Sequence, residues 1–134
     1  MNYWKIGELA AECGCQIQTI RYYEREGLLP PPARSQGNYR KYSAEHVQRL
    51  LFIRHCRSLD MTLEEVRRLL YFKDAPEENC GEVNSLLDRH IDGIASRLIE
   101  LANLQTQLKA LRATCRDAQE AKNCGILHQL DGQK

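Results

Sequence analysis

Apolar residues in the first part of the chain recur at helical spacing in short segments that glycine and proline interrupt. Residues 6–12 show this spacing and are followed by a glycine turn. Residues 16–26 show it again, with Ile17 and Ile20 facing inward and Gly27 as the stop. Two short helices joined by a tight turn predict a helix-turn-helix.

The stretch after the second helix predicts a small β-hairpin. Three consecutive prolines at positions 30–32 favour an extended backbone. Gln-Gly-Asn at positions 36–38 is typical of a turn, with residues 33–35 and 39–42 as the flanking strands. A hairpin that follows a helix-turn-helix is called a wing, so the pattern predicts a winged helix-turn-helix.

Two further helices are predicted behind the wing. Ser43 is a helix N-cap, and the apolar spacing continues to Ser58. Thr-Leu-Glu-Glu at positions 62–65 has the capping-box pattern and begins a helix that runs to about Tyr71. The polar residues 74–80 then separate this head, residues 1–73, from the rest of the chain.

Residues 81–114 predict one long helix, because they contain no proline and only one glycine after the first position. About 33 helical residues extend about 50 Å. A helix this long cannot bury an apolar stripe alone, and the head is too small to cover it, so we expect a homodimer with antiparallel or parallel long helices. The stripe has coiled-coil gaps of four and three, with one irregularity, over Leu87, Ile91, Ile94, Leu98, Leu101, Leu104, Leu108 and Leu111.

Charge is distributed unevenly along the chain. Residues 1–73 carry 12 Lys and Arg against 8 Asp and Glu, and residues 74–134 carry 7 against 10. A basic first part is consistent with nucleic-acid binding. The chain has no secretory signal pattern and no apolar run of about 18 residues, so we expect a cytoplasmic protein without a membrane segment.

Arginine and tyrosine gather in residues 19–29 and again in residues 34–42. Arginine offers several N–H donors to phosphates and base edges, and tyrosine adds a flat ring with a polar tip. So many such groups on a short helix and its following loop favour a surface that lies on DNA.

Three of the six cysteines lie around the long helix. Cys80 precedes it, and Cys115 and Cys124 follow it. Cys80 and Cys115 of one chain lie a helix length apart and cannot share a metal, whereas Cys115 and Cys124 can meet through a short loop. If two long helices pair antiparallel, Cys80 of one chain joins Cys115 and Cys124 of the other, which gives two three-thiolate sites in a dimer. The alternative is three ordinary thiols at helix ends.

Three thiolates favour soft or borderline ions such as Hg(II), Pb(II), Cd(II) and Zn(II). Zinc and cadmium usually need a fourth ligand, for which Asp117, Glu120 and His128 are nearby candidates. The Cys-Gly-Cys turn at positions 13–15 is a weak metal signal, and Cys56 is expected to pack in the core.

With these motifs in place, the chain resembles the MerR family of metal-responsive transcription regulators. Residues 52–61 and 80–91 are most similar to its lead- and cadmium-responsive branch, whereas copper sensors of the family lack a cysteine at the position of Cys80. The resemblance covers nearly the whole chain and rests further on residues 6–9 (Ile-Gly-Glu-Leu), 19–24 (Thr-Ile-Arg-Tyr-Tyr-Glu), 27–29 (Gly-Leu-Leu) and 38–42 (Asn-Tyr-Arg-Lys-Tyr).

The resemblance implies a homodimer on a palindromic promoter, with RNA polymerase as a further partner. It implies that a bound metal changes the shape of the promoter, and it favours Pb(II) or Cd(II) over Hg(II) or Zn(II). Tyr23 is expected to pack beneath the second helix instead of reading DNA. The DNA contacts that the family pattern assigns fall on Thr19, Arg21, Tyr22, Arg34, Tyr39 and Arg40, with Arg54 and Arg57 as phosphate contacts.

The expected fold is mainly α. It comprises the winged helix-turn-helix head (1–73), a linker (74–80), a long antiparallel dimerisation helix (81–114) and a metal-binding loop with a short helix (115–134). Two other functions compete with metal sensing. A small-molecule-responsive regulator would need an aromatic pocket, and residues 74–134 contain no aromatic side chain. A thiol enzyme or metallochaperone would need a cysteine paired with a base, and it would leave the Arg/Tyr head unexplained.

Overall fold

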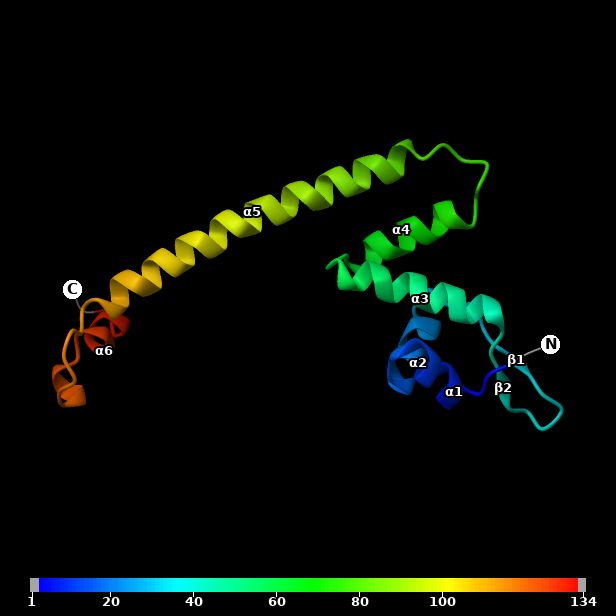
Figure 1. Cartoon of the computed structure of the whole chain (residues 1–134), viewed down its shortest axis with the longest axis horizontal. Helices are drawn as coiled ribbons and strands as arrows, with labels where there is room; N and C mark the ends of the chain where they lie inside the picture. The colour runs from blue at the N-terminus through cyan, green and yellow to red at the C-terminus, as the bar shows by residue number, and fades with distance from the viewer. Residues whose placement is uncertain (1–2, 133–134) are drawn as a thin grey trace. The chain divides into compact units, whose positions relative to one another are not determined.

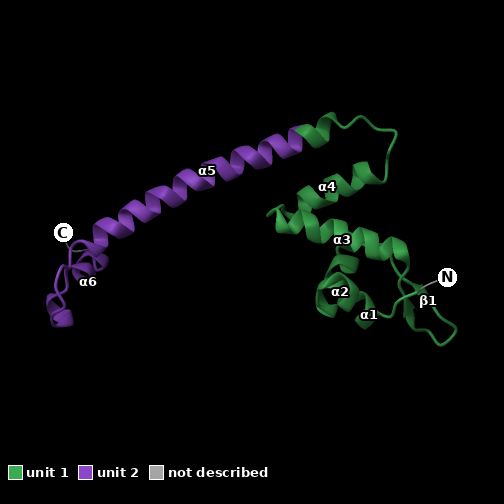
Figure 2. Ribbon diagram, in the orientation of Figure 1, with its two compact units in different colours: residues 1–84 green, residues 85–134 purple. Residues whose placement is uncertain are grey.

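The computed structural model describes residues 3–132 and is mainly helical (Figure 1). The chain divides into two compact units, residues 1–84 and residues 85–134 (Figure 2). No helix within residues 3–132 is both long enough and apolar enough to cross a membrane. The elements in chain order are α1 (Ile6–Cys13), α2 (Ile17–Arg25), β1 (Ala33–Arg34), β2 (Arg40–Lys41), α3 (Ala44–Ser58), α4 (Leu63–Lys73), α5 (Gly81–Arg112), the 3-10 helix η1 (Ala121–Asn123) and α6 (Gly125–Leu130).

The first unit closes around one hydrophobic core, to which α1, α2, α3 and α4 all contribute. Ile20 is fully buried, as the helical spacing predicted, but Ile17 is 37% exposed, so its predicted inward orientation is wrong. Ile17 is the first residue of α2, where no earlier turn of the helix supports its side chain against the core. The largest fully buried side chains are Leu9, Ile20, Leu28, Leu29, Tyr42, Leu50, Ile53 and Val66.

Local sequence signals set the helix ends in this unit. Gly14 and Gly27 have positive φ values of 66° and 75° and turn the chain after α1 and α2. Before α4, the Thr62 amide donates to a carboxylate oxygen of Glu65 at 2.8 Å, and the Glu65 amide donates to the Thr62 hydroxyl at 3.1 Å. The reciprocal pair confirms the predicted capping box.

The wing has three backbone segments, one more than the sequence predicted. β1 and β2 pair antiparallel, with Ala33 opposite Lys41 and Arg34 opposite Arg40. Trp4 forms an additional bridge with Tyr42, in which each amide donates to the other residue's carbonyl, at 2.8 and 2.9 Å. The residues just before α1 therefore run beside the wing.

Side chains fasten the wing and its flanking loop to the helices. The Tyr42 hydroxyl donates to Glu24 Oε1 on α2 at 2.6 Å. His46 is buried at the start of α3, where its Nδ1 accepts from the Ser43 amide at 3.1 Å. Its Nε2 lies 3.0 Å from the carbonyl oxygen of Pro30, so this nitrogen carries the proton. His46 is therefore a packing residue of the head.

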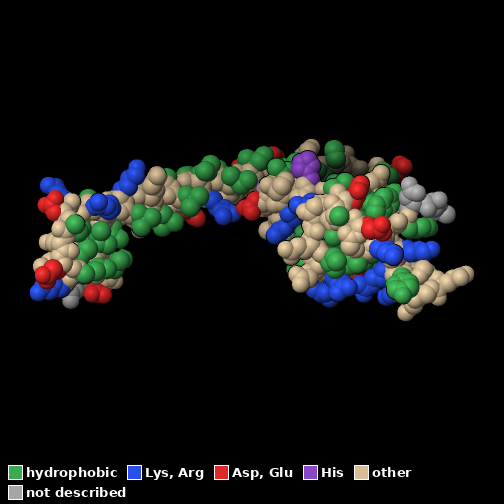
Figure 3. Space-filling view, turned by 60° about the horizontal axis from the view of Figure 1, so that its bottom comes forward, with side chains coloured by type: hydrophobic (Ala, Val, Ile, Leu, Met, Phe, Trp, Pro, Cys, Tyr) green, Lys and Arg blue, Asp and Glu red, His purple; other side chains and the backbone are tan. Residues whose placement is uncertain are grey.

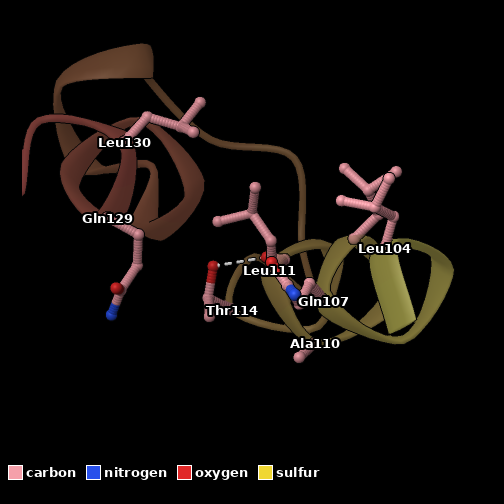
Figure 4. A pocket seen from close by; sticks show the side chains of 8 residues that line it. Leu104, Gln107, Ala110, Leu111, Thr114, Gln129 and Leu130 are labelled. Carbon is pink, nitrogen blue, oxygen red and sulfur yellow. Dashed lines mark hydrogen bonds between the residues drawn. The ribbon is translucent and has the colours of Figure 1, made fainter. Parts of the chain in front are cut away.

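In α5, 32 residues form one uninterrupted helix, about 48 Å long. The side chains of its predicted seam are solvent-exposed from Leu87 to Leu108, and Leu111 is partly buried. Among the described residues 85–132, no segment covers the seam over most of its length. Near the end of α5, Leu104, Leu108 and Leu111 form an apolar hollow with Leu130 of α6 (Figure 4).

Candidate DNA interface and metal-binding thiols

Helix α2 presents polar side chains on the face opposite the core. Arg21 and Tyr22 are exposed, and Thr19 is half-buried. Tyr22 places its ring 5.9 Å from the Arg25 guanidinium. Tyr23 is only 7% exposed and packs in the core, which confirms its predicted structural role.

The wing carries the second group of predicted DNA contacts. Tyr39 projects from its tip and is 71% exposed. Arg34 Nη1 donates to the carbonyl oxygen of Asn38 at 3.2 Å, and the Tyr39 amide donates to the Ser35 hydroxyl at 3.1 Å. Asn38 has a φ of 65°, a left-handed conformation that asparagine tolerates in turns. These bonds fix the shape of the short hairpin.

A basic hollow of about 330 Å³ lies between α2, the wing and the start of α1. It brings together four residues that were predicted to contact DNA, and the polar side chains of Lys5 and Asn38 also line it. Lysine and arginine side chains gather along this side of the head (Figure 3). The lining residues are Lys5, Ile6, Arg21, Arg34, Asn38, Tyr39 and Arg40, with no acidic residue among them.

Other predicted contacts line a second hollow of about 310 Å³, on the other side of α2. Thr19 and Tyr22 line it together with Arg57 of α3. The structure thus brings residues from α2 and α3 to one surface, although they are far apart in the sequence.

Arg54 and Arg57 both bond to backbone carbonyls within the head. Arg54 Nη1 donates to the carbonyl oxygens of Cys13 and Gly14 at the end of α1. Arg57 Nη1 donates to the carbonyl oxygen of Met61 at 2.6 Å. Each guanidinium has five N–H groups, so these bonds leave others for a phosphate, and the DNA contacts of both residues stay predictions.

The Cys115 and Cys124 thiols lie together in the loop after α5. A hydrogen bond with Cys124 is the main cause that raises the pKa of Cys115. The pKa of Cys124 is lowered, first by the backbone amide of Leu127 and then by that of Ile126. Cys124 is the N-cap of α6, and amides at a helix start favour a thiolate.

Cys80 is exposed and immediately precedes α5. Within residues 3–132 of one chain, no three His, Cys, Asp or Glu side chains cluster closely enough to hold a metal ion. A Cys115–Cys124 pair thus needs a ligand from elsewhere to become a three-coordinate site.

The other candidate ligands have different partners. His128 Nε2 lies 2.7 Å from the carbonyl oxygen of Lys122, and Glu120 forms a 3.2 Å ion pair with the Lys122 ammonium.

Cys56 is buried in the core, as expected, and burial raises its pKa. A buried thiol of raised pKa is a poor metal ligand, because metals bind the thiolate.

Comparison with known proteins identifies the head. The family described as "MerR HTH family regulatory protein" matches residues 4–73, and the one described as "MerR, DNA binding" matches residues 47–111. The chain belongs to the MerR family. Members of this family are transcription regulators and not enzymes, so the basic hollow lies on a DNA-binding head.

Three relatives extend the match beyond the head. A ZntR homologue from Haemophilus influenzae, an HTH-type transcriptional regulator, is 50% identical over 81% of this chain and 80% of its own. The lead(II) complex of the regulator PbrR691 from Ralstonia metallidurans is 52% identical, with a TM-score of 0.86 over 94% of this chain and 98% of that chain. The mercury(II) complex of MerR from Bacillus megaterium is 32% identical, with a TM-score of 0.72 over 96% of this chain and 99% of that chain.

Proposed function

We propose that this MerR-family chain is a metal-dependent activator of heavy-metal resistance or efflux genes. It binds its promoter as a homodimer and responds to a soft divalent ion. The observation that carries the proposal is the position of its thiols. Cys115 and Cys124 lie together after α5, and Cys80 lies before it, about 48 Å away along the helix. The lead(II) and mercury(II) complexes of two relatives support a metal effector.

The exposed seam of α5 supports the homodimer. Leucines such as Leu98 and Leu101 are more than half exposed in the single chain, and a second helix would bury them. An antiparallel pair places the start of one α5 beside the end of the other. The partner's Cys80 then reaches Cys115 and Cys124 and completes three thiolates, twice in each dimer.

Pb(II) and Cd(II) are the favoured ions, followed by Hg(II) and Zn(II). Thiolates are soft ligands that these ions accept, and the loop already brings two thiols together. A Cd(II) or Zn(II) site would take a fourth ligand, which Asp117, Glu120, His128 or water could supply. Since the thiols must lose protons to bind, metal affinity falls as the pH falls.

The head explains how the ion controls transcription. Arg21, Tyr22 and the wing contact the promoter, with Arg54 and Arg57 at its phosphates. The metal-free dimer holds the promoter in an unproductive shape, and the metal-bound dimer distorts it so that RNA polymerase engages it. The ion acts by stabilising one conformation of the dimer over the other.

A small-molecule effector is the second candidate, because the second unit does contain a hollow. It measures about 680 Å³ and is lined mainly by aliphatic side chains of α5 and α6, such as Leu104, Leu111 and Leu130 (Figure 4). No aromatic residue lies in residues 74–134 to stack on a drug-like ligand. The paired thiols favour the metal.

Mixed dimers of two cysteine variants test the shared site. A Cys80→Ser chain paired with a Cys115→Ser chain has one complete end and one end that lacks two thiols. Equilibrium dialysis with Pb(II) or Cd(II) should give two tightly bound ions per wild-type dimer, one per mixed dimer and none per homodimer of either variant. A tight site in a variant homodimer, or none in the mixed dimer, would overturn the cross-chain site.

Transcription gives the second readout. Each single cysteine variant should lose metal-induced transcription from a reporter while its metal-free form still binds the promoter. Titrating the reporter with Pb(II), Cd(II), Hg(II) and Zn(II) identifies the effector. A response that survives all three cysteine replacements would favour the small-molecule reading.

A further inference from the structure

The basic hollow contains one cation that neither the family pattern nor the sequence assigned to DNA binding. Lys5 is an exposed residue immediately before α1. It lines the hollow with Arg21 of α2 and with Arg34 and Arg40 of the wing. These four cations come from three separate segments of the chain.

Backbone pairing fixes the position of Lys5. The neighbouring Trp4 exchanges two hydrogen bonds with Tyr42, at 2.8 and 2.9 Å, which holds this segment beside β2. Lys5 is also the N-cap of α1, and its amide donates to Glu8 Oε1 in the first turn of that helix at 2.8 Å. Lys5 is therefore held between a strand-like bridge and a helix start, so its side chain emerges at a defined place.

The charge around the hollow favours an anion. Its lining contains four cations and no carboxylate, and Asn38 and Tyr39 add polar groups. Glu8 is the closest acidic neighbour along the chain, and its carboxylate already accepts the Lys5 amide. An ammonium group is a compact charge suited to a phosphate oxygen, and it carries little information about base identity.

We propose that this hollow holds one phosphodiester group of the DNA backbone and that Lys5 is a phosphate contact of the regulator. Arg21, on α2, remains free to reach toward the bases while Lys5 and the wing arginines hold the strand beside it. The role of Lys5 is to fix the register of the head on the duplex. This inference rests on the proposed DNA-binding function and deepens it.

Salt dependence of binding tests the contact. Each phosphate contact contributes about 0.9 to the slope of log K against log salt concentration. Lys5→Gln should reduce that slope by about 0.9 for every chain bound to the duplex. The substitution should weaken binding to specific and to non-specific duplexes by the same factor. Lys5→Arg should keep most of the wild-type affinity. Lys73→Gln removes a lysine of α4 that does not line the hollow and should leave the slope unchanged.

Neutral phosphate analogues locate the contact. Duplexes with a single methylphosphonate at successive positions lack one backbone charge at a time. Wild-type protein should lose affinity at the phosphate held in the hollow, and Lys5→Gln should lose less at that position because only the arginines still contact it. Equal losses for both proteins at every position, or an unchanged salt slope in Lys5→Gln, would overturn the proposal.

Two further measurements separate this inference from its alternatives. Inorganic phosphate at constant ionic strength should not displace wild-type protein from DNA. Displacement of wild-type protein but not of Lys5→Gln would assign the hollow to free phosphate instead. If wild-type protein bound no promoter duplex, the proposed function itself would fail. If wild-type protein binds the promoter and Lys5→Gln binds it with the same affinity and the same salt dependence, only this inference is contradicted.

Discussion

Arginines in the head make two kinds of contact. One group donates to backbone carbonyls where helices end. Arg54 bonds to the end of α1, and Arg67 Nη1 bonds to the Glu26 carbonyl after α2 at 2.5 Å. Carbonyls at helix ends lack helical partners, so such bonds stabilise the fold. The other group, which includes Arg21, lines the basic hollow.

Arg21 should therefore affect DNA binding far more than stability. We expect Arg21→Ala to cost about 1–3 kcal/mol of specific binding, because it removes a donor from the exposed face of α2. Gel-shift titration at fixed salt measures this loss, and the thermal midpoint should stay near that of wild type. Arg89→Ala, on α5, is the matched control. Equal DNA affinity in Arg21→Ala and Arg89→Ala would remove Arg21 from the interface.

At the scale of elements, Arg49 of α3 connects three segments. Its Nε donates to the Leu28 carbonyl at 2.7 Å, and its Nη1 donates to Asp74 Oδ1 at 2.8 Å. Leu28 follows α2, and Asp74 is the C-cap of α4, just before the segment that leads to Cys80. The hydrogen bond from Arg49 is the main cause that lowers the pKa of Asp74.

The two bonds of Arg49, to the Leu28 carbonyl and to Asp74, should contribute differently to the free energy of unfolding. Arg49→Ala leaves the carbonyl of the buried Leu28 without this donor and should cost about 1–3 kcal/mol of unfolding free energy. Asp74→Asn should cost less than about 1 kcal/mol, because the Asp74 side chain is 54% exposed and water screens the pair. Urea unfolding at neutral pH compares the two variants. A larger cost for Asp74→Asn would mean that the ion pair, and not the carbonyl bond, holds α3 to its neighbours.

The pH dependence of this pair follows from the lowered pKa of Asp74. A folded-state pKa below the usual value of 3.8 means that the pair stabilises the fold above that pH. The contribution is lost as the pH falls through the folded-state pKa, below 3.8. The stability difference between wild type and Asp74→Asn should therefore shrink in that acidic range.

The elements that the sequence predicted depend on residues close together in the chain. The turn at Gly27 and the Thr62–Glu65 capping box are local signals, and the structure confirms both. The Trp4–Tyr42 bridge joins residues 38 positions apart and has no local signature. Lys5 was missed for the same reason, since only that bridge brings it to the wing.

At the scale of the whole molecule, the long seam of α5 predicts the assembly. Leu98, near its middle, is 62% exposed in the single chain, and the adjacent Ile99 is 64% exposed but lies off the seam. Leu98→Asp should give monomers, because dimerisation would bury the new carboxylate against the partner helix. Ile99→Asp should remain dimeric. Sedimentation measures both, and an intact dimer in Leu98→Asp would mean that the seam packs elsewhere.

The thiol site was predictable only in part. The sequence placed Cys115 and Cys124 in one short loop, and the structure brings their thiols together. The short helix predicted after the second of these thiols is α6, with Cys124 as its N-cap, but the sequence did not indicate that its amides lower the pKa of that thiol. Cys80 stays at the far end of α5, so the complete site remains a prediction about two chains.

The division of aromatic residues between the two parts of the chain makes the protein its own optical probe. The single tryptophan and all the tyrosines lie within residues 1–73, and none follows. Trp4 is held against the wing by its two bonds to Tyr42. Near-ultraviolet emission therefore comes from the head alone, whereas the Cys115 and Cys124 thiols lie in a region without fluorophores. A change in Trp4 emission on adding a metal ion, without DNA, that is lost in Cys115→Ser would reveal an event at those thiols that has reached the wing.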